Sequence, residues 1–184
     1  MKKRILITGG TGFIGYHVAK KCIDMGWEVV SLSKGKPNSI RTIKKVKYLI
    51  GDLTKKKDLK VLKKKFDYVV NAAGVVDHST NKDVFKAHYL GCKNLANFFL
   101  KKKIKLFLQI GSCVEYGQQK SPQKENFNSK MTNLKSMYSK GKLAASRYLL
   151  DLHNKYKFPV IVFRLYLNYG PNQDFNRFLP IIID

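Results

Sequence analysis

A short apolar strand that breaks into glycines and runs at once into an amphipathic helix constrains this chain more than any other feature. Residues Ile5 to Ile7 predict a buried strand, which is followed by Gly9, Gly10, Gly12 and Gly15. The next residues carry an apolar face at Ile14, Val18, Cys22 and Ile23, and place Tyr16, Lys20 and Asp24 opposite. Glycines permit the tight turn and let the backbone approach a pyrophosphate at the amino end of the helix. The order of these elements predicts a dinucleotide site; a glycine-rich turn that binds nothing is the alternative.

The rest of the chain alternates between predicted strands and helices. Strands are predicted at 28–32, 46–50, 67–71, 106–110 and 160–165, and helices at 55–65, 81–101 and 136–154. A polar loop at 118–134 is long enough to suggest a function. The alternation predicts an α/β fold, a doubly wound parallel sheet with helices on both faces. Such sheets bind ligands at the carboxyl ends of their strands, so candidate site residues are those that follow each strand.

The charge and the cysteines exclude several classes of protein. The formal net charge is +24, but lysine supplies nearly all of it, and arginine, which is preferred for phosphate and base contacts, occurs only at positions 4, 41, 147, 164 and 177. A solvated lysine surface is therefore expected, without specific nucleic-acid binding. Cys22, Cys92 and Cys113 have no metal-ligand spacing and form an odd set, which indicates a reducing compartment and no metal site. With no signal peptide and no membrane-spanning run, a cytoplasmic protein is expected.

The end of the second strand bears on the choice between NAD and NADP. An acidic side chain there would bind the adenosine ribose and favour NAD. Glu28 lies at the wrong end of that strand, and its far end carries Ser33 and Lys34, with Lys36 and Arg41 nearby. The missing carboxylate and the nearby cations favour NADP, with NAD as the alternative; ordinary loop lysines would have the same appearance.

One Tyr-x-x-x-Lys pair is a candidate for catalysis. Tyr138 and Lys142 share a helical face, where an ammonium near a phenol favours the phenolate and a proton can be exchanged with a sugar hydroxyl. The spacing also occurs at Tyr16/Lys20, Tyr89/Lys93 and Tyr116/Lys120, so context decides. The helix of Tyr138 continues its apolar face, and it follows the strand that ends at Ser112, whose hydroxyl could bond the same oxygen. A serine that caps local backbone is the alternative for Ser112.

These residues resemble the extended short-chain dehydrogenase/reductase family, and more narrowly its NAD(P)-dependent nucleotide-sugar epimerases and dehydratases. The motifs that carry the resemblance are residues 8–15, Asp52-Leu53, Ala73-Gly74, Ser112 with Tyr116-Gly117, residues 138–142, and Arg164 with Tyr169-Gly170-Pro171. The resemblance implies a Rossmann-type sheet and an enzyme that acts on a nucleotide-diphosphate sugar, with Ser112, Tyr138 and Lys142 as catalytic residues. The cofactor-binding residues expected from it and from the strand ends are Gly9, Gly12, Phe13, Ile14, Gly15, Ser33, Lys34, Asp52, Leu53, Ala72, Ala73, Gly74, Tyr138, Lys142 and Tyr166.

Departures from the family pattern narrow the reaction that is expected of this chain. The 4,6-dehydratases of the family carry an Asp-Glu pair after the catalytic threonine, where this chain has Cys113 and Val114, with Glu115 one position late. His88 occupies the position of the family's helix asparagine. His78 and His88 are interpreted as ordinary polar residues, so the sequence does not favour a hydrolase. The segments around Ser112 and Arg164 look more like reductases of 4-keto-6-deoxy nucleotide sugars.

The length suggests that the substrate-binding domain is largely missing. Family members usually continue for roughly a hundred residues or more, so residues 1–171 are predicted to form the dinucleotide-binding domain and 172–184 the start of a truncated second domain. The apolar segment 176–183 has no visible partner in the sequence. A non-catalytic NADP-binding interaction or sensor protein is the alternative function. By family analogy, helices 81–101 and 136–154 are candidate surfaces of a homodimer.

Overall fold

A single parallel sheet forms the centre of the molecule in the computed structural model, which describes residues 2–75, 81–126 and 129–183. Its six strands have the order β3-β2-β1-β4-β5-β6. They are β1 (Arg4–Thr8), β2 (Glu28–Ser33), β3 (Lys47–Ile50), β4 (Tyr68–Asn71), β5 (Leu106–Ser112) and β6 (Val160–Leu165). The chain starts at the middle of the sheet, builds one half, and then crosses over β1 to build the other. The predicted Rossmann-type α/β fold is confirmed.

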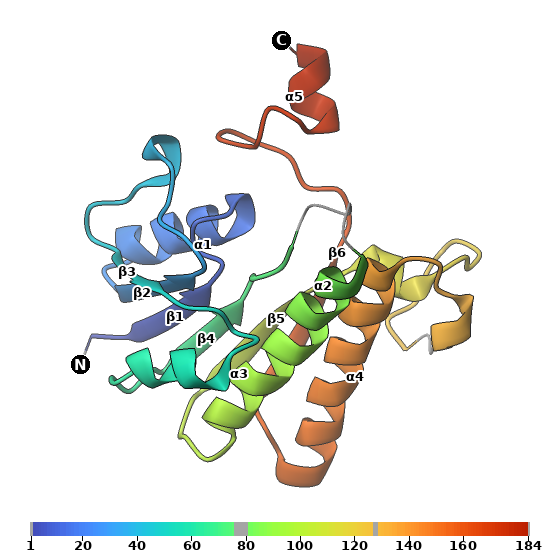
Figure 1. Cartoon of the computed structure of the whole chain (residues 1–184), viewed down its shortest axis with the longest axis horizontal. Coiled ribbons are helices and arrows are strands. Elements are labelled where there is room, and N and C mark those ends of the chain that lie inside the picture. The colour runs from blue at the N-terminus through green and yellow to red at the C-terminus, as the bar shows by residue number, and fades with distance from the viewer. Residues whose placement is uncertain (1, 76–80, 127–128, 184) are drawn as a thin grey trace.

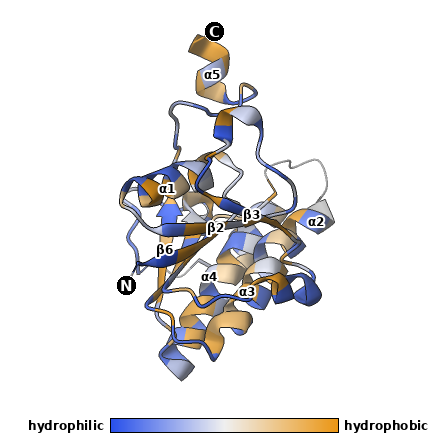
Figure 2. Ribbon diagram, turned by 90° about the vertical axis from the view of Figure 1, so that its left-hand side faces the viewer, coloured by the Kyte–Doolittle hydropathy of each residue, from blue (hydrophilic) through white to orange (hydrophobic). Residues whose placement is uncertain are grey.

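Helices cover both faces of this sheet, as Figures 1 and 2 show. The α-helices are α1 (Phe13–Asp24), α2 (Asn81–Phe85), α3 (Gly91–Leu100), α4 (Met137–Tyr156) and α5 (Phe178–Ile183). Short helical turns are η1 (Ser39–Arg41), η2 (Lys56–Val61), η3 (Lys86–Leu90), η4 (Cys113–Tyr116) and η5 (Met131–Asn133). Helix α1 lies on one face, and α2, α3 and α4 lie together on the other.

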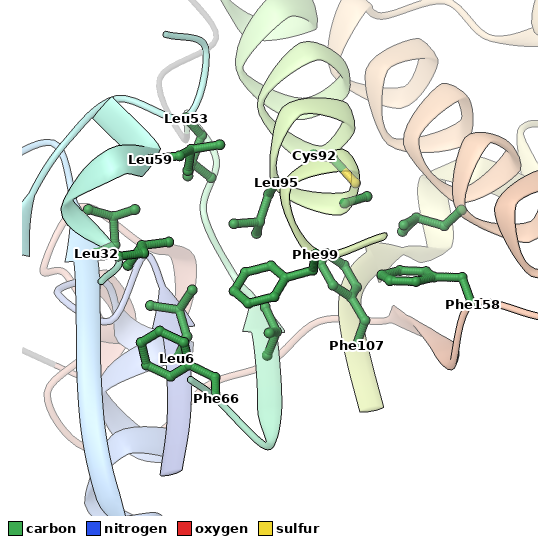
Figure 3. Close-up of a cluster of buried hydrophobic side chains, with 14 of the residues drawn as sticks. Leu6, Leu32, Leu53, Leu59, Phe66, Cys92, Leu95, Phe99, Phe107 and Phe158 are labelled. Carbon is green, nitrogen blue, oxygen red and sulfur yellow. The ribbon is translucent and has the colours of Figure 1, made fainter. Parts of the chain in front are cut away.

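Alternating side chains of the strands feed two hydrophobic clusters, one on each face. On β1, Ile5 and Ile7 pack towards α1, whereas Leu6 packs towards α3. The larger cluster includes Phe99 of α3 and Phe107 of β5, both fully buried, and Figure 3 shows these rings between the sheet and the helix. Burial of a large apolar side chain stabilises the folded state by about 1.5–3 kcal/mol. Contacts of this kind fix the strands relative to the helices, and with them the residues at the strand ends.

Two predicted helices differ from the observed ones. The predicted helix at 55–65 is only the 3₁₀ turn η2, in which the Asp58 carboxylate accepts the backbone N–H of Asp52 (2.9 Å). The predicted helix at 81–101 consists of α2 and α3 joined by η3, which is one turn of π-helix. A π turn contains an extra residue, and here it turns His88 into the protein interior.

One prediction for α1 is wrong. Tyr16 was expected opposite the apolar face, but it is buried, and its hydroxyl accepts a hydrogen bond from the Asn172 side chain (3.3 Å). Residues after β6 cross over the start of α1 and cover this tyrosine. Ile14, Val18 and Ile23 pack against the cluster as predicted.

The end of the chain projects from the sheet. Figure 1 shows α5 apart from the other helices, and its side chains Phe178, Ile181, Ile182 and Ile183 are exposed. On β6, Ile161 and Phe163 are also exposed, on the face that α1 covers elsewhere in the sheet. The proposed boundary between a first domain at 1–171 and a second at 172–184 stays a prediction.

Candidate functional site

A crevice of about 570 Å³ opens at the carboxyl ends of the strands, where the order of the sheet reverses between β1 and β4. Open parallel sheets bind ligands at this position. The crevice is lined by every residue that the sequence nominated: Gly9, Gly12, Phe13, Ile14, Gly15, Ser33, Lys34, Asp52, Leu53, Ala72, Ala73, Gly74, Ser112, Tyr138, Lys142 and Tyr166. These residues come from distant parts of the sequence, and the fold brings them to one place.

The glycine turn forms one wall of the crevice with backbone atoms. Gly9 has a positive φ of 72° and donates its N–H to the Leu32 carbonyl (2.9 Å), which joins the turn to β2. A Cβ on Gly15 would overlap the Gly9 carbonyl oxygen and lie 2.8 Å from the Gly10 Cα, so the helix meets the turn at van der Waals distance. No side chain caps the amino end of α1 at Gly12, and its first turn has no acidic residue. The free N–H groups and the helix dipole there suit a pyrophosphate.

The end of β2 presents an unsatisfied hydroxyl. The Ser33 side chain is buried, lines the crevice, and its Oγ has no hydrogen-bond partner among the described residues. A buried hydroxyl without a partner is costly, and a ribose hydroxyl of a bound dinucleotide would satisfy it. Together with the uncapped helix, this atom shows that the residues present fit a dinucleotide.

The carboxylate of Asp52 faces the same part of the crevice. Burial raises the pKa of Asp52, but hydrogen bonds from the Thr54 backbone (2.9 Å) and hydroxyl (2.8 Å), and the Lys34 ammonium at 3.3 Å, together bring it below its ordinary value. Asp52 is therefore ionised at neutral pH, and Lys34 is its ion-pair partner.

Ser112, Tyr138 and Lys142 converge on the opposite wall. Ser112 is the last residue of β5, and the other two lie one turn apart on α4, whose start is capped by Ser136 through the N–H of Ser139 (3.0 Å). The Tyr138 hydroxyl is hydrogen-bonded to the Ser112 side chain. The Lys142 ammonium lies 5.7 Å from the centre of the Tyr138 ring and donates to the Ile110 carbonyl (2.8 Å).

Burial dominates the ionisation of this group. Burial raises the pKa of Tyr138 above 10, and the hydrogen bond with Ser112 lowers it by less. Burial also lowers the pKa of Lys142 to about 8, against the attraction of Glu115, which raises it. The sequence predicted that Lys142 would favour the phenolate, but in this structure the ammonium donates to a backbone carbonyl, and burial raises the pKa of Tyr138.

A buried ion pair supports, from behind, the wall that Ser112, Tyr138 and Lys142 form. Glu115 is almost fully buried; it accepts the Ser112 N–H (2.8 Å) and pairs with the Arg164 guanidinium (3.2 Å). The Ser112 hydroxyl in turn accepts from the Val114 N–H (3.4 Å), so the capping alternative raised for this serine is also real. Glu115 does not line the crevice, and its carboxylate holds Ser112 in place from outside it.

A chain of buried polar groups connects the two walls across the sheet. Thr8 donates to Asn71 (2.6 Å), and Asn71 donates to Gln109 (2.7 Å), on three neighbouring strands. Gln109 then donates to the Ile110 carbonyl (3.0 Å), which also accepts from Lys142. Fully bonded networks of this kind fix the positions of their members.

His88 is a site residue that the sequence interpretation missed. It is buried, lines the crevice, and lies edge-on to the Tyr138 ring at 4.8 Å between ring centres, with Nε2 at 3.2 Å from the Val75 carbonyl. A Cβ on Gly74 would overlap its imidazole, so a larger residue at position 74 would require the His88 ring to shift. The sequence contained a signal for this residue, because His88 occupies the position of the family's helix asparagine. His78 lies outside the described residues.

The segment after β6 supplies further wall residues that no motif indicated. Gln173, Asp174 and Arg177 line the crevice although they are distant from the glycine turn in sequence. Arg41, which was expected to attract a phosphate, is instead buried against Asp174 and the Asn172 carbonyl.

Fold and site together define a protein of the Rossmann type with a Ser-Tyr-Lys group at its crevice. The model of the NAD dependent epimerase/dehydratase family matches residues 5–184. The chain belongs to this family, as the resemblance in its motifs predicted.

Among curated proteins, the chain is 29% identical over 150 residues to a bifunctional UDP-glucose and UDP-xylose 4-epimerase of Pisum sativum, covering 71% of this chain and 43% of the relative. It is 27% identical over 197 residues to the human dTDP-D-glucose 4,6-dehydratase, covering 98% and 55%. The chain thus spans about half the length of the curated relatives it matches.

Solved structures share the fold. A UDP-glucose 4-epimerase of Thermotoga maritima crystallised with UDP-glucose has a TM-score of 0.86 at 22% identity, covering 95% of this chain and 59% of that one. A dTDP-glucose 4,6-dehydratase of Bacillus anthracis in complex with NAD has a TM-score of 0.83 at 22% identity, covering 98% and 60%. In the described part of this chain, no helix has the length and apolar character needed to cross a membrane.

Proposed function

We propose that the chain binds NAD or NADP in the crevice and forms the catalytic half of an enzyme that oxidises or reduces a carbon of a nucleotide-diphosphate sugar. The observation that carries this proposal is the convergence of Ser112, Tyr138 and Lys142 on the crevice that the glycine turn also lines. Family membership and the epimerase and dehydratase relatives support it.

Each of these three residues has a separate role in the proposed reaction. The Tyr138 hydroxyl exchanges a proton with the sugar oxygen, and the Ser112 hydroxyl, which is already hydrogen-bonded to it, orients that oxygen. Lys142 holds the nicotinamide ribose and places a positive charge near the phenol. When it is bound, the nicotinamide supplies the chemistry of hydride exchange.

The kind of reaction is a narrower proposal. Cys113 and Val114 occupy the positions of the dehydratase Asp-Glu pair, and Glu115 is held by Arg164 outside the crevice. These facts favour a reductase or an epimerase over a 4,6-dehydratase. Steady consumption of reduced cofactor with a keto-sugar nucleotide would identify a reductase, and tightly retained cofactor without net consumption an epimerase.

The decisive experiment replaces Tyr138 by Phe and measures turnover of UDP- or dTDP-sugars together with NADH and NADPH binding. Removal of a general acid–base group is expected to slow turnover by about 10²–10⁴-fold while cofactor affinity stays within about threefold. Tyr156→Phe, at an exposed position on the same helix, is the matched control. In a version of the protein that includes the substrate-binding domain, turnover that survives in Tyr138→Phe would reject the mechanism. Cofactor binding without any turnover by that unaltered version would support the sensor alternative.

Three finer points stay predictions from the sequence. They are the preference for NADP that the sequence indicates at Ser33 and Lys34, which the charges in the folded structure oppose, the cytoplasmic location, and the homodimer. A calorimetric titration with NADPH and NADH tests the first of these directly.

A further inference from the structure

The segment of residues 170–174, called the strap below, crosses from the end of β6 to the far side of the crevice. His17 Nε2 lies 2.9 Å from the Pro171 carbonyl oxygen, and the Asn172 side chain donates to the Tyr16 hydroxyl (3.3 Å), so the strap is attached to α1. The Arg41 Nε donates to the Asn172 carbonyl (3.0 Å) and attaches it to η1. The strap thereby reaches the connection that leaves the end of β2.

The strap ends in a carboxylate that holds Arg41. The Arg41 guanidinium forms an ion pair with Asp174, and only 7% of the Arg41 side chain is exposed, against 48% of Asp174. Asp174 lines the crevice together with Ser33 and Lys34, whereas Arg41 is behind it and does not line the crevice. A ligand at the end of β2 therefore meets the carboxylate, and the guanidinium is engaged elsewhere.

This arrangement changes the charge balance that the sequence indicates. Of the cations near the end of β2, Lys34 is paired with Asp52 at 3.3 Å and Arg41 is paired with Asp174. Lys36 is exposed and does not line the crevice. A carboxylate accepts hydrogen bonds from the 2′- and 3′-hydroxyls of an adenosine ribose but repels a 2′-phosphate. The acidic residue that is missing from the end of β2 is supplied by a residue 141 positions further along the chain than Ser33.

We propose that Asp174 determines the choice of dinucleotide, by holding Arg41 away from a 2′-phosphate and by presenting a carboxylate to the ribose, so that the chain binds NAD in preference to NADP. The inference rests on the proposed binding of a dinucleotide in the crevice. The buried Ser33 hydroxyl without a partner provides a second contact for the same ribose.

The test compares Asp174→Asn with the unaltered chain by titration with NADH and NADPH at one fixed ionic strength. The unaltered chain is expected to bind NADH more tightly. Asp174→Asn removes the repulsion and releases Arg41, so NADPH affinity rises by about tenfold while NADH affinity changes less than threefold. Asp174→Ala provides a second replacement with the same expected direction.

Two further variants make the assignment specific. In the double variant Asp174→Asn/Arg41→Gln the gain in NADPH affinity disappears, because the released guanidinium is the group that binds the phosphate. Asp151→Asn removes an exposed carboxylate from α4 and leaves the ratio of affinities unchanged. Tighter binding of NADPH by the unaltered chain, or a ratio that Asp174→Asn does not change, would overturn the inference. Failure of the unaltered chain to bind either dinucleotide would instead overturn the proposed function.

Discussion

The two walls of the crevice are built on different physical principles. The glycine wall, which consists of the Gly9–Gly15 turn, the start of α1 and Ser33, uses backbone atoms at van der Waals distance and a helix end without a cap. The catalytic wall, which consists of Ser112, Tyr138 and Lys142, uses titratable side chains supported by the buried Glu115. The glycine wall depends on shape, and the catalytic wall on charges held in a buried environment.

Because of this difference, the two walls are expected to be disrupted by different kinds of substitution. A steric wall fails when any atom is added, whatever its charge, because backbone atoms on both sides cannot move apart without loss of packing. An electrostatic wall tolerates a change of shape but fails when one partner of a buried pair is lost. The following four predictions test this contrast.

Gly15→Ala is expected to have the largest effect, because its Cβ would overlap the Gly9 carbonyl oxygen and approach the Gly10 Cα. We expect a loss of more than about 4 kcal/mol in the free energy of unfolding, measured by urea denaturation. Gly35→Ala is the matched control, because Gly35 has no atom within 4 Å of a new Cβ, and its effect should stay within about 0.5 kcal/mol. Equal stability of the two variants would contradict the steric description of the glycine wall.

Glu115→Gln keeps the shape of the side chain and removes its charge. The Arg164 guanidinium loses its buried partner, so we expect a loss of about 3 kcal/mol in the free energy of unfolding. Glu125→Gln, at an exposed carboxylate, is the control and should be nearly neutral. If Glu115→Gln is as mild as its control, charge is not what supports Ser112.

Lys142→Met should alter how stability depends on pH. The folded pKa of Lys142 is about 8 and its ordinary value 10.5, so between about pH 8 and 10.5 the unfolded chain binds more protons than the folded one. This lysine therefore makes stability rise with pH in that window, by at most about 1.4 kcal/mol per pH unit, and its penalty is fully present below pH 8. Lys142→Met should lose this slope in urea titrations, and Lys101→Met controls for the removal of one exposed charge. Parallel pH profiles of Lys142→Met and the unaltered chain would contradict the description of a buried ammonium.

Ser33→Ala should have the smallest effect, confined to ligand binding. Loss of one hydrogen bond to a ribose hydroxyl costs about 0.5–1.5 kcal/mol, so NADH affinity should fall by about two- to tenfold in calorimetry. Ser31→Ala is a close control, since Ser31 is also buried on β2 and its Oγ has no partner in the part of the chain that the structure describes, but it faces Gly10 instead of the crevice. The same loss in both variants would show that Ser33 does not touch the ligand.

Much of the site could be predicted because motifs report local geometry. The glycine spacing requires a tight turn, and the spacing of Tyr138 and Lys142 requires one helical face, so both follow from the chain itself. The alternation of strands and helices then places the strand ends on one edge, which explains why all nominated residues line the crevice. The helix predicted at 55–65 is instead a 3₁₀ turn whose Leu59 and Leu62 pack into the core, a case in which tertiary context overrides local helix propensity.

The sequence by itself determined the alternation of strands and helices, the glycine turn and the Ser112, Tyr138 and Lys142 candidates, because each depends on patterns within short segments of the chain. Only the tertiary structure decided the electrostatics: that Arg41 is held by Asp174, that His88 lies against Tyr138, and that burial sets the pKa of Lys142. The physical reason is that ion pairing and desolvation depend on distances between residues far apart in the chain, which a local pattern does not encode.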